Sequence, residues 1–110
     1  MDIARFHEII KELLVAWAEP TSEGEGIRTE IVIDRDRGHY EIMEVGWSND
    51  QRIHNSIIHI DIIGNKVWLQ QNTTEIRVAE ELVAAGIPRQ AIVLGFHPPR
   101  VRQFTEYAVA

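Results

Sequence analysis

Residues 53–71 read IHNSIIHIDIIGNKVWLQQ, two β-rich runs that meet at Gly64-Asn65. Isoleucine and valine dominate both runs, and a two-residue Gly-Asn link between such runs is a strong signal for a β-hairpin. In the first run the isoleucines alternate onto both faces of an extended strand, with Ile53, Ile57 and Ile63 on one face and Ile58, Ile60 and Ile62 on the other. Because a strand that is apolar on both faces is central or covered twice, we expect helices on one face and a second subunit or the C-terminal segment on the other.

An amphipathic helix is expected over residues 3–18, because apolar side chains recur there at intervals of three and four. Residues 19–26, EPTSEGEG, contain a GxG, but no helix follows, so we expect a mobile loop and not a dinucleotide-binding turn. The strands are expected over residues 27–34, 39–47, 53–63 and 66–71, with turn signals between them.

A second helix is expected after the strands, over residues 75–85. Thr73 or Thr74 is expected to cap its N-terminus with a side-chain oxygen. Gly86 is expected to end it, because glycine adopts the left-handed conformation that commonly follows a helix.

Residues 91–96, AIVLGF, are expected to be extended and buried, and Pro98-Pro99 could open a last short helix. Together these patterns predict one domain, residues 1–110, of the α+β class. Its expected architecture is a four-stranded antiparallel meander with the N-terminal helix and the second helix packed on it, and a short C-terminal segment.

The composition is that of an ordinary globular protein. Of the 110 residues, 45% are hydrophobic and 25% are charged, and the absence of cysteine excludes disulfides, thiolate metal sites and a cysteine nucleophile. A net charge of -6 argues against broad, non-specific binding to nucleic acid, which needs positive charge. The sequence shows neither a signal peptide nor an apolar run long enough to span a bilayer, so we expect a cytoplasmic protein without membrane contact.

His59 and Asp61 form the most prominent polar pair, because residues two apart on a strand share a face, and Asn55 is expected on that face too. A metal site would need a third ligand, for which the candidates are His39, Glu41 and His54. His54 has the opposite parity, so it could join His59 only if a β-bulge intervened. We expect a hydrogen-bonded polar pair in a sheet or an interface, with no metal and no cofactor.

Signatures of catalytic sites are missing from the sequence. A restriction-type nuclease would need an Asp/Glu-x-Lys, and none occurs; GxSxG, GxxxxGK[ST] and HExxH do not occur either. We therefore expect no catalytic residues and a protein that is not an enzyme.

Residues 89–102 carry Arg89, Arg100 and Arg102 and no acidic residue, and His97 lies in the same stretch. These side chains could contact an anion or DNA at the start of the last short helix, where backbone N–H groups lack helical partners. The favoured interpretation is a set of solvated or salt-bridged arginines in an acidic protein.

The motifs of the chain follow a recognisable order: Gly46-Trp47, Arg52-x-His54, IHIDI at residues 58–62, Trp68-x-Gln70, Thr74-Glu75, Gly86-Ile87-Pro88, IVL at residues 92–94, and Phe104-Thr105-Glu106. This order, which runs from the first helix to the C-terminus, resembles the XisI family, the cyanobacterial fdxN element excision controlling factors. The chain departs from the family at three positions: Asn55, where glycine is expected, Asn72, where an acid is common, and Arg77, where glycine is common.

The resemblance implies an α+β protein that is required, with an XisH-type companion and a site-specific recombinase, for excising a DNA element during heterocyst differentiation. The family has no established catalytic residues that could be carried over. Because XisH-type companions resemble nucleases, a chain without nuclease carboxylates would suit a controlling subunit.

The first hypothesis is accordingly a non-enzymatic accessory factor that acts through protein partners and forms a homo-oligomer. Its candidate contact residues are Trp47, Arg52, His54 and Trp68, since a tryptophan on an uncovered sheet face is a natural interface residue. The second hypothesis is direct DNA binding through the arginines of residues 89–102. The third is a metal-dependent enzyme at His59 and Asp61.

Overall fold

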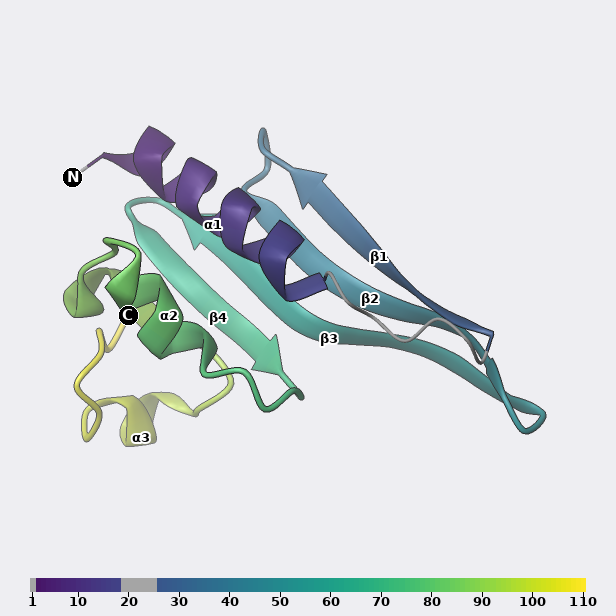
Figure 1. Ribbon diagram of the computed structural model, residues 1–110. Coiled ribbons are helices and arrows are strands. Elements are labelled where there is room, and N and C mark those ends of the chain that lie inside the picture. Colours follow the sequence, from purple (N-terminus) through teal and green to yellow (C-terminus); the bar gives the residue numbers. More distant parts are fainter. Residues whose placement is uncertain (1, 19–25) are drawn as a thin grey trace.

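The computed structural model describes residues 2–18 and 26–110 of the chain (Figure 1). In chain order the elements are α1 (Ile3–Ala18), β1 (Ile27–Asp34), β2 (His39–Ser48), β3 (Gln51–Ile63), β4 (Lys66–Asn72), α2 (Val78–Ala84), the 3₁₀ turn η2 (Arg89–Ala91), β5 (Ile92–Leu94) and α3 (Pro99–Arg102). The expected loop at residues 19–26 lies outside the described residues except for Gly26. Among the helices of the described ranges, none has the length and apolar character that crossing a membrane requires.

The strands form a single mixed sheet in the order β1-β2-β3-β4-β5. The first four strands pair antiparallel, whereas β5 lies parallel to β4, with Val67 opposite Ile92 and Leu69 opposite Leu94. The prediction of a four-stranded antiparallel sheet is therefore wrong, because a fifth strand, parallel to its neighbour, makes the sheet mixed. A three-residue strand is too short to show an alternating hydrophobic pattern in the sequence. Two neighbouring parallel strands must be joined by a crossover connection, and α2 lies in the connection between β4 and β5.

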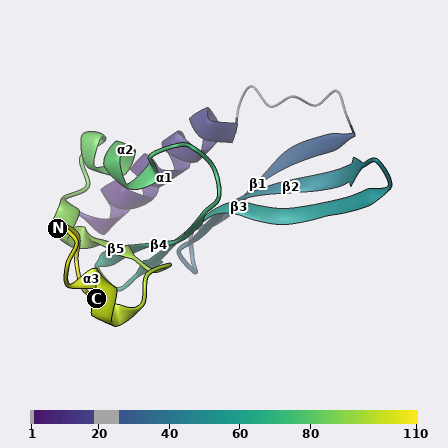
Figure 2. The same ribbon diagram turned by 90° about the horizontal axis from the view of Figure 1, so that it is seen from below.

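One face of the sheet, here called the covered face, packs against α1 and α2 (Figure 1 and Figure 2). Helix α1 buries Phe6, Ile9, Ile10 and Leu14 at the helical spacing of three and four, and the predicted helix over residues 3–18 is confirmed. The strands complete this core with Tyr40, Ile42, Ile58, Ile60, Ile62, Val67, Leu69, Ile92 and Leu94. The side chains that α1, α2 and the strands bury together form one core on the covered face.

A β-bulge in β3 decides which of its side chains reach the other face of the sheet. The consecutive β2 residues Ile42 and Met43 pair with Ile58 and Ser56, which leaves Ile57 as an extra residue that shifts the alternation. The side chain of Ile57 packs against the covered core together with the isoleucines that follow it. The prediction that this strand is apolar on both faces is therefore wrong.

The opposite face, here called the open face, mixes polar and apolar side chains along its central strands. β3 places on it Arg52, His54, Ser56, His59, Asp61 and Ile63, and β2 places on it His39, Glu41, Met43, Val45 and Trp47. Of the three isoleucines expected on this face, only Ile63 lies on it. The open face therefore does not demand a second apolar cover along its whole length.

The C-terminal segment, residues 95–110, covers the β4–β5 end of the open face. Val93 pairs with Ala108 in an isolated parallel bridge, and the guanidinium of Arg102 lies 5.0 Å from the centre of the Trp68 ring. Figure 2 shows α3 and the C-terminus on the side of the sheet away from α1 and α2, while the β2–β3 hairpin projects beyond the other labelled elements. The expected cover by the C-terminal segment is thus present at one end of the sheet.

Helix α2 begins later than predicted, because Asn72 and Thr74 hold the chain in a turn. Oδ1 of Asn72 accepts hydrogen bonds from the backbone N–H and the hydroxyl of Thr74, at 2.9 and 2.6 Å, and the Thr74 hydroxyl accepts one from the N–H of Ile76 at 3.1 Å. These contacts lie before the helix, so the prediction that Thr73 or Thr74 caps it is wrong. The predicted end is confirmed, since Gly86, with a φ of +121°, follows the last turn.

Candidate functional site

A group of two histidines and two carboxylates lies on the open face, where β2 and β3 pair. It consists of His39, Glu41, His59 and Asp61 and is here called the histidine–carboxylate cluster. The register places His39 opposite Asp61 and Glu41 opposite His59, so the four side chains emerge on one side at neighbouring positions. The arrangement is therefore held by the backbone pairing of two strands and not by a loop.

Asp61 lies between the two histidines of the cluster. Its Oδ1 atom is 3.0 Å from Nδ1 of His39 and 3.0 Å from Nε2 of His59. On the far side of His39, Nε2 lies 3.2 Å from Oε1 of Glu41, and the other oxygen of Glu41 lies 4.0 Å from Nδ1 of His59. The imidazole ring centres are 4.6 Å apart in an edge-to-face arrangement. Each histidine thus has a carboxylate near both of its ring nitrogens.

A second β-bulge, in β4, brings Gln70 to the cluster. The register shifts between His59 and Ile60, which leaves Gln70 as the extra residue of β4. Its Nε2 donates a hydrogen bond to Oδ2 of Asp61 at 3.2 Å. A Cβ atom at Gly95 would lie 2.5 Å from Oε1 of Gln70, so the glycine makes room for this amide. The hydrogen bond orients the carboxylate with its other oxygen toward the histidines.

Hydrogen bonds and nearby charges in the cluster shift the pKa values of His39 and Glu41 against the effect of burial. Burial acts to lower the pKa of His39, but hydrogen bonds to Glu41 and Asp61 outweigh burial and raise that pKa above its ordinary value of 6.5. Burial acts to raise the pKa of Glu41, but the nearby Ser56 hydroxyl and the histidines outweigh burial and lower that pKa. The Ser56 hydroxyl approaches Glu41 without ordinary hydrogen-bond geometry and has no hydrogen-bond partner among the described residues. The surroundings favour an ionised Glu41 beside an imidazole that readily holds a proton.

The bulge in β3 also changes the places of two neighbours of His59. Asn55, expected on the face of His59, lies on the opposite side of the sheet because the extra residue intervenes. His54 lies on the open face for the same reason, but it is paired with Val45, away from the cluster. Of the three candidates for a third ligand, the two on β2 join the predicted His–Asp pair and His54 does not.

The projecting end of the β2–β3 hairpin carries an aromatic–cationic pair. Trp47 is 55% exposed, and the guanidinium carbon of Arg52, on the opposing strand position, lies 5.4 Å from the ring centre. His54 follows two residues further along the same face, and these three residues are here called the hairpin patch. Trp68, the fourth candidate contact residue, does not join them, because it lies beneath Arg102 of the C-terminal segment.

The basic residues near the C-terminus do not converge on one anion site. Arg89 pairs with Glu106, with Nε and Oε1 3.4 Å apart. Arg102 donates to the carbonyl oxygen of His97 at 3.0 Å and to one further carbonyl at 3.3 Å. Arg100 is exposed and makes no ion pair with any described residue. Two of the three arginines therefore hold the C-terminal segment in place.

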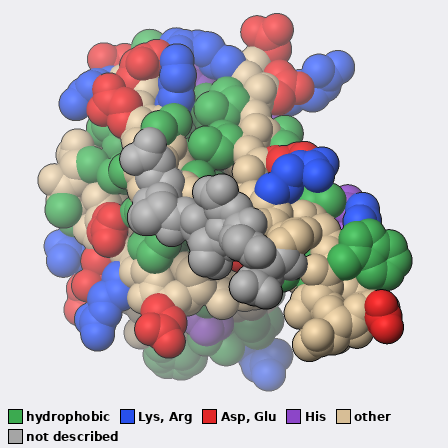
Figure 3. Space-filling view, turned by 45° about the vertical axis from the view of Figure 1, so that its right-hand side comes forward, with side chains coloured by type: hydrophobic (Ala, Val, Ile, Leu, Met, Phe, Trp, Pro, Cys, Tyr) green, Lys and Arg blue, Asp and Glu red, His purple; other side chains and the backbone are tan. Residues whose placement is uncertain are grey.

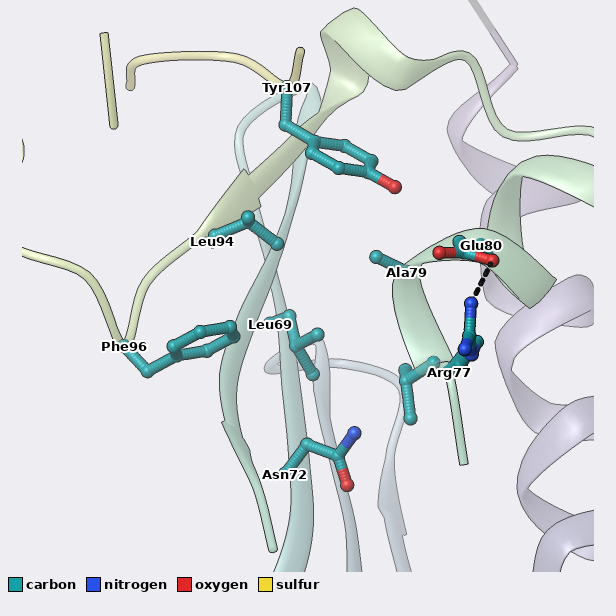
Figure 4. A pocket seen from close by; sticks show the side chains of 9 residues that line it. Leu69, Asn72, Arg77, Ala79, Glu80, Leu94, Phe96 and Tyr107 are labelled. Atoms are coloured by element: carbon teal, nitrogen blue, oxygen red, sulfur yellow. Dashed lines mark ion pairs between the residues drawn. The ribbon is translucent and has the colours of Figure 1, made fainter. Parts of the chain in front are cut away.

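A groove that no local sequence pattern indicates lies between α2 and the β4–β5 edge of the sheet (Figure 4). Its volume is about 250 Å³, and it is lined by Leu69, Asn72, Arg77, Val78, Ala79, Glu80, Leu94, Phe96 and Tyr107. The charged groups of Arg77 and Glu80 pair with each other at 3.7 Å, as Figure 4 shows. The remaining lining is mainly apolar, so the groove offers shape and surface but little chemistry.

The family model described as XisI protein matches residues 1–109 of the chain. Among solved structures, the chain is similar to a XisI-like protein from Anabaena variabilis, with 41% identity over 99% of this chain and 100% of that chain and a TM-score of 0.94. It is also similar to the fdxN element excision controlling factor XisI from Anabaena variabilis, with 29% identity over 97% of each chain and a TM-score of 0.86. No curated protein matches the chain with significant similarity.

Proposed function

This chain belongs to the XisI family, and on that premise we propose that it is an accessory factor that controls the site-specific excision of a DNA element of the fdxN type. The observation that carries the proposal is the match of residues 1–109 to the family, together with the overlap of 97% of each chain with a relative named for this role. In this proposal the chain acts in cyanobacterial heterocyst differentiation and works through protein partners, without catalysis of its own.

The hairpin patch supports action through a partner. Interface residues that contribute most to binding energy are enriched in tryptophan and arginine, and here Trp47 and Arg52 lie together at the end of the β2–β3 hairpin. Because 55% of Trp47 is exposed, docking would remove a large aromatic surface from water. Covering this pair would therefore strengthen binding more than covering most other surface positions.

The partner in this proposal is the XisH-type companion, with the recombinase machinery as the further component. The hairpin patch would serve either partner binding or self-association in a homo-oligomer. The histidine–carboxylate cluster lies on a strand face and does not line the groove of Figure 4, which is why we assign it no substrate.

The test is co-purification of this chain with an XisH-type protein, followed by a binding titration. We expect Trp47→Ala or Arg52→Ala to weaken the complex by about 30-fold or more, the range of interface residues that dominate binding. Phe104→Ala is the matched control, because Phe104 is 84% exposed but lies on the C-terminal segment. Equal binding by wild type and both hairpin variants, or no complex at all, would remove the proposed partner surface.

Direct DNA binding through Arg89, Arg100 and Arg102 is the less supported alternative. Arg89 and Arg102 already make contacts within the chain, and Figure 3 shows acidic and basic side chains interspersed over the face in view. A salt-titrated DNA-binding assay separates the two hypotheses, because affinity that comes from phosphate contacts decreases steeply with salt. We expect no such salt-dependent binding, and Arg100→Ala should leave any weak binding unchanged.

A further inference from the structure

We propose that His39, His59 and Asp61 form a binding site for one divalent first-row transition-metal ion, with Zn²⁺ the best match. The inference stands on the geometry of the open face and does not depend on the role in excision. Its starting point is that three metal-ligating side chains from two paired strands bring their ligand atoms within 4.8 Å of one another.

The spacing of the ligand atoms is close to what an ion would require. With Zn–N and Zn–O bonds of about 2.0–2.1 Å, neighbouring ligand atoms in a tetrahedral site lie about 3.3 Å apart. Oδ1 of Asp61 is already 3.0 Å from a nitrogen of His39 and 3.0 Å from a nitrogen of His59. The ion would take the place of the protons in these close pairs, and side-chain rotation would bring the two histidine nitrogens, now within 4.8 Å of each other, to the tetrahedral spacing.

The groups behind the three ligands are those that orient ligands in metal sites. If His39 binds through Nδ1, its Nε2–H points to Glu41 at 3.2 Å, which forms a carboxylate–histidine–metal relay. The same carboxylate lies 4.0 Å from Nδ1 of His59, whose Nε2 faces Asp61. Gln70 donates to the oxygen of Asp61 that does not face the histidines. Both imidazoles and the carboxylate are therefore held in the orientation that binding needs.

The donor set selects the class of metal. Two imidazoles and one carboxylate suit Zn²⁺, Fe²⁺ or Co²⁺, whereas Mg²⁺ and Ca²⁺ prefer six or more oxygen ligands. The three ligands project from one side of the sheet, so a water or a group of a docked partner would occupy the remaining position. Glu41 and Asp61 favour positive charge beside the histidines, so a divalent cation would bind in competition with a proton on His39.

The competing interpretation is a cluster held by hydrogen bonds and ion pairs alone. Such a cluster needs no second carboxylate behind the histidines, nor a glutamine that fixes one oxygen of Asp61. It also makes a different prediction, because replacing one histidine would then change only local stability and would leave no metal affinity to lose.

The experiment uses the full-length protein stripped of metal and titrated with Zn²⁺ by calorimetry and with Co²⁺ by absorption spectroscopy. We expect one ion per chain for the wild type, a loss of more than about 100-fold for His39→Ala and His59→Ala, and a loss of about 10- to 100-fold for Glu41→Gln. His54→Ala is the matched control, because His54 lies on the same face outside the cluster and should bind as the wild type does.

Circular dichroism establishes that each variant is folded, and His59→Gln replaces His59→Ala if the latter is not. Folded wild-type protein that binds neither ion more tightly than about 0.1 mM would overturn the site. An equal loss in His54→Ala would also overturn it, since binding would then be spread over surface histidines.

Discussion

The covered and open faces of the sheet are formed by the same strands, but the covered face is an apolar core and the open face carries polar side chains as well. On β3, Ile58 and Ile60 point into the covered face and are 0% exposed. Between and beyond them, His59 and Asp61 point to the open face, with 25% and 21% of their side chains exposed. One strand can therefore specify the fold with one set of side chains and leave the alternate set for recognition.

The neighbouring strand repeats the contrast with adjacent residues. Tyr40 is buried in the covered core, where its hydroxyl is hydrogen-bonded to Nδ1 of His7 on α1. His39, one position earlier, belongs to the cluster on the open face. Substitutions on the two faces should therefore affect different properties of the protein.

The largest expected effect is on stability, from Ile60→Ala on the covered face. Removing this fully buried side chain should cost about 2–5 kcal/mol of the free energy of unfolding, because apolar burial is lost and a cavity remains. Ile63→Ala, on the same strand but 53% exposed, should cost less than about 0.5 kcal/mol. Urea unfolding measures both, and equal losses would mean that the two faces do not differ as described.

A smaller effect is expected from the two tryptophans of the open face. Trp68→Ala should cost about 1–3 kcal/mol, because the ring lies beneath Arg102 and supports the C-terminal segment. Trp47→Ala should change the free energy of unfolding by less than about 0.5 kcal/mol, since this ring is 55% exposed. Limited proteolysis should show faster cleavage after residue 95 in Trp68→Ala alone; faster cleavage in both variants would contradict the assignment.

The smallest expected effect is a pH dependence of the free energy of unfolding, caused by His7 of α1, which contacts Tyr40 of the covered core. Burial, and then the charge of Arg35, lower the pKa of His7 below its ordinary value of 6.5, and Glu8 acts in the opposite direction. The unfolded chain therefore binds this proton more tightly than the folded one. The stability that depends on neutral His7 is complete above about pH 6.5 and is lost as the pH falls through the lower pKa of the folded state.

His7→Gln should remove this part of the pH dependence. We expect the difference in free energy of unfolding between wild type and variant to shrink as the pH is lowered from about 8 to about 5. Urea unfolding at several pH values measures the difference. A difference that grows toward acid would show that His7 is protonated in the folded protein.

Local sequence patterns are sufficient to predict the elements in which apolar side chains recur at a regular interval or a turn has a characteristic pair of residues. The period of Phe6, Ile10 and Leu14 predicts α1, and the Gly64-Asn65 link predicts the hairpin that pairs Ile63 with Lys66. The direction of β5 does not follow from any local pattern, because it depends on the crossover through α2.

The site is harder to predict, because it depends on register. His59 and Asp61 can be paired from their spacing alone, but the third position could be assigned only as one of several candidates. The bulge that moves His54 onto the open face and Asn55 off it is hidden in a run of isoleucines, where each position looks alike. His39 and Glu41 join the cluster through the pairing of β2 with β3, which brings together residues far apart in the sequence. Only this pairing shows that the two residues complete the cluster.

The central claim, that the open face at the β2–β3 hairpin receives the partner, is tested most directly by hydroxyl-radical footprinting with and without the XisH-type protein. Met43 and Trp47 report on this face, Trp17 of α1 reports on the helical side, and Phe104 reports on the C-terminal segment. We predict that the complex lowers the oxidation of Met43 and Trp47 several-fold and leaves Trp17 and Phe104 unchanged. Protection of Trp17 or Phe104 with Trp47 still fully oxidised would contradict the account.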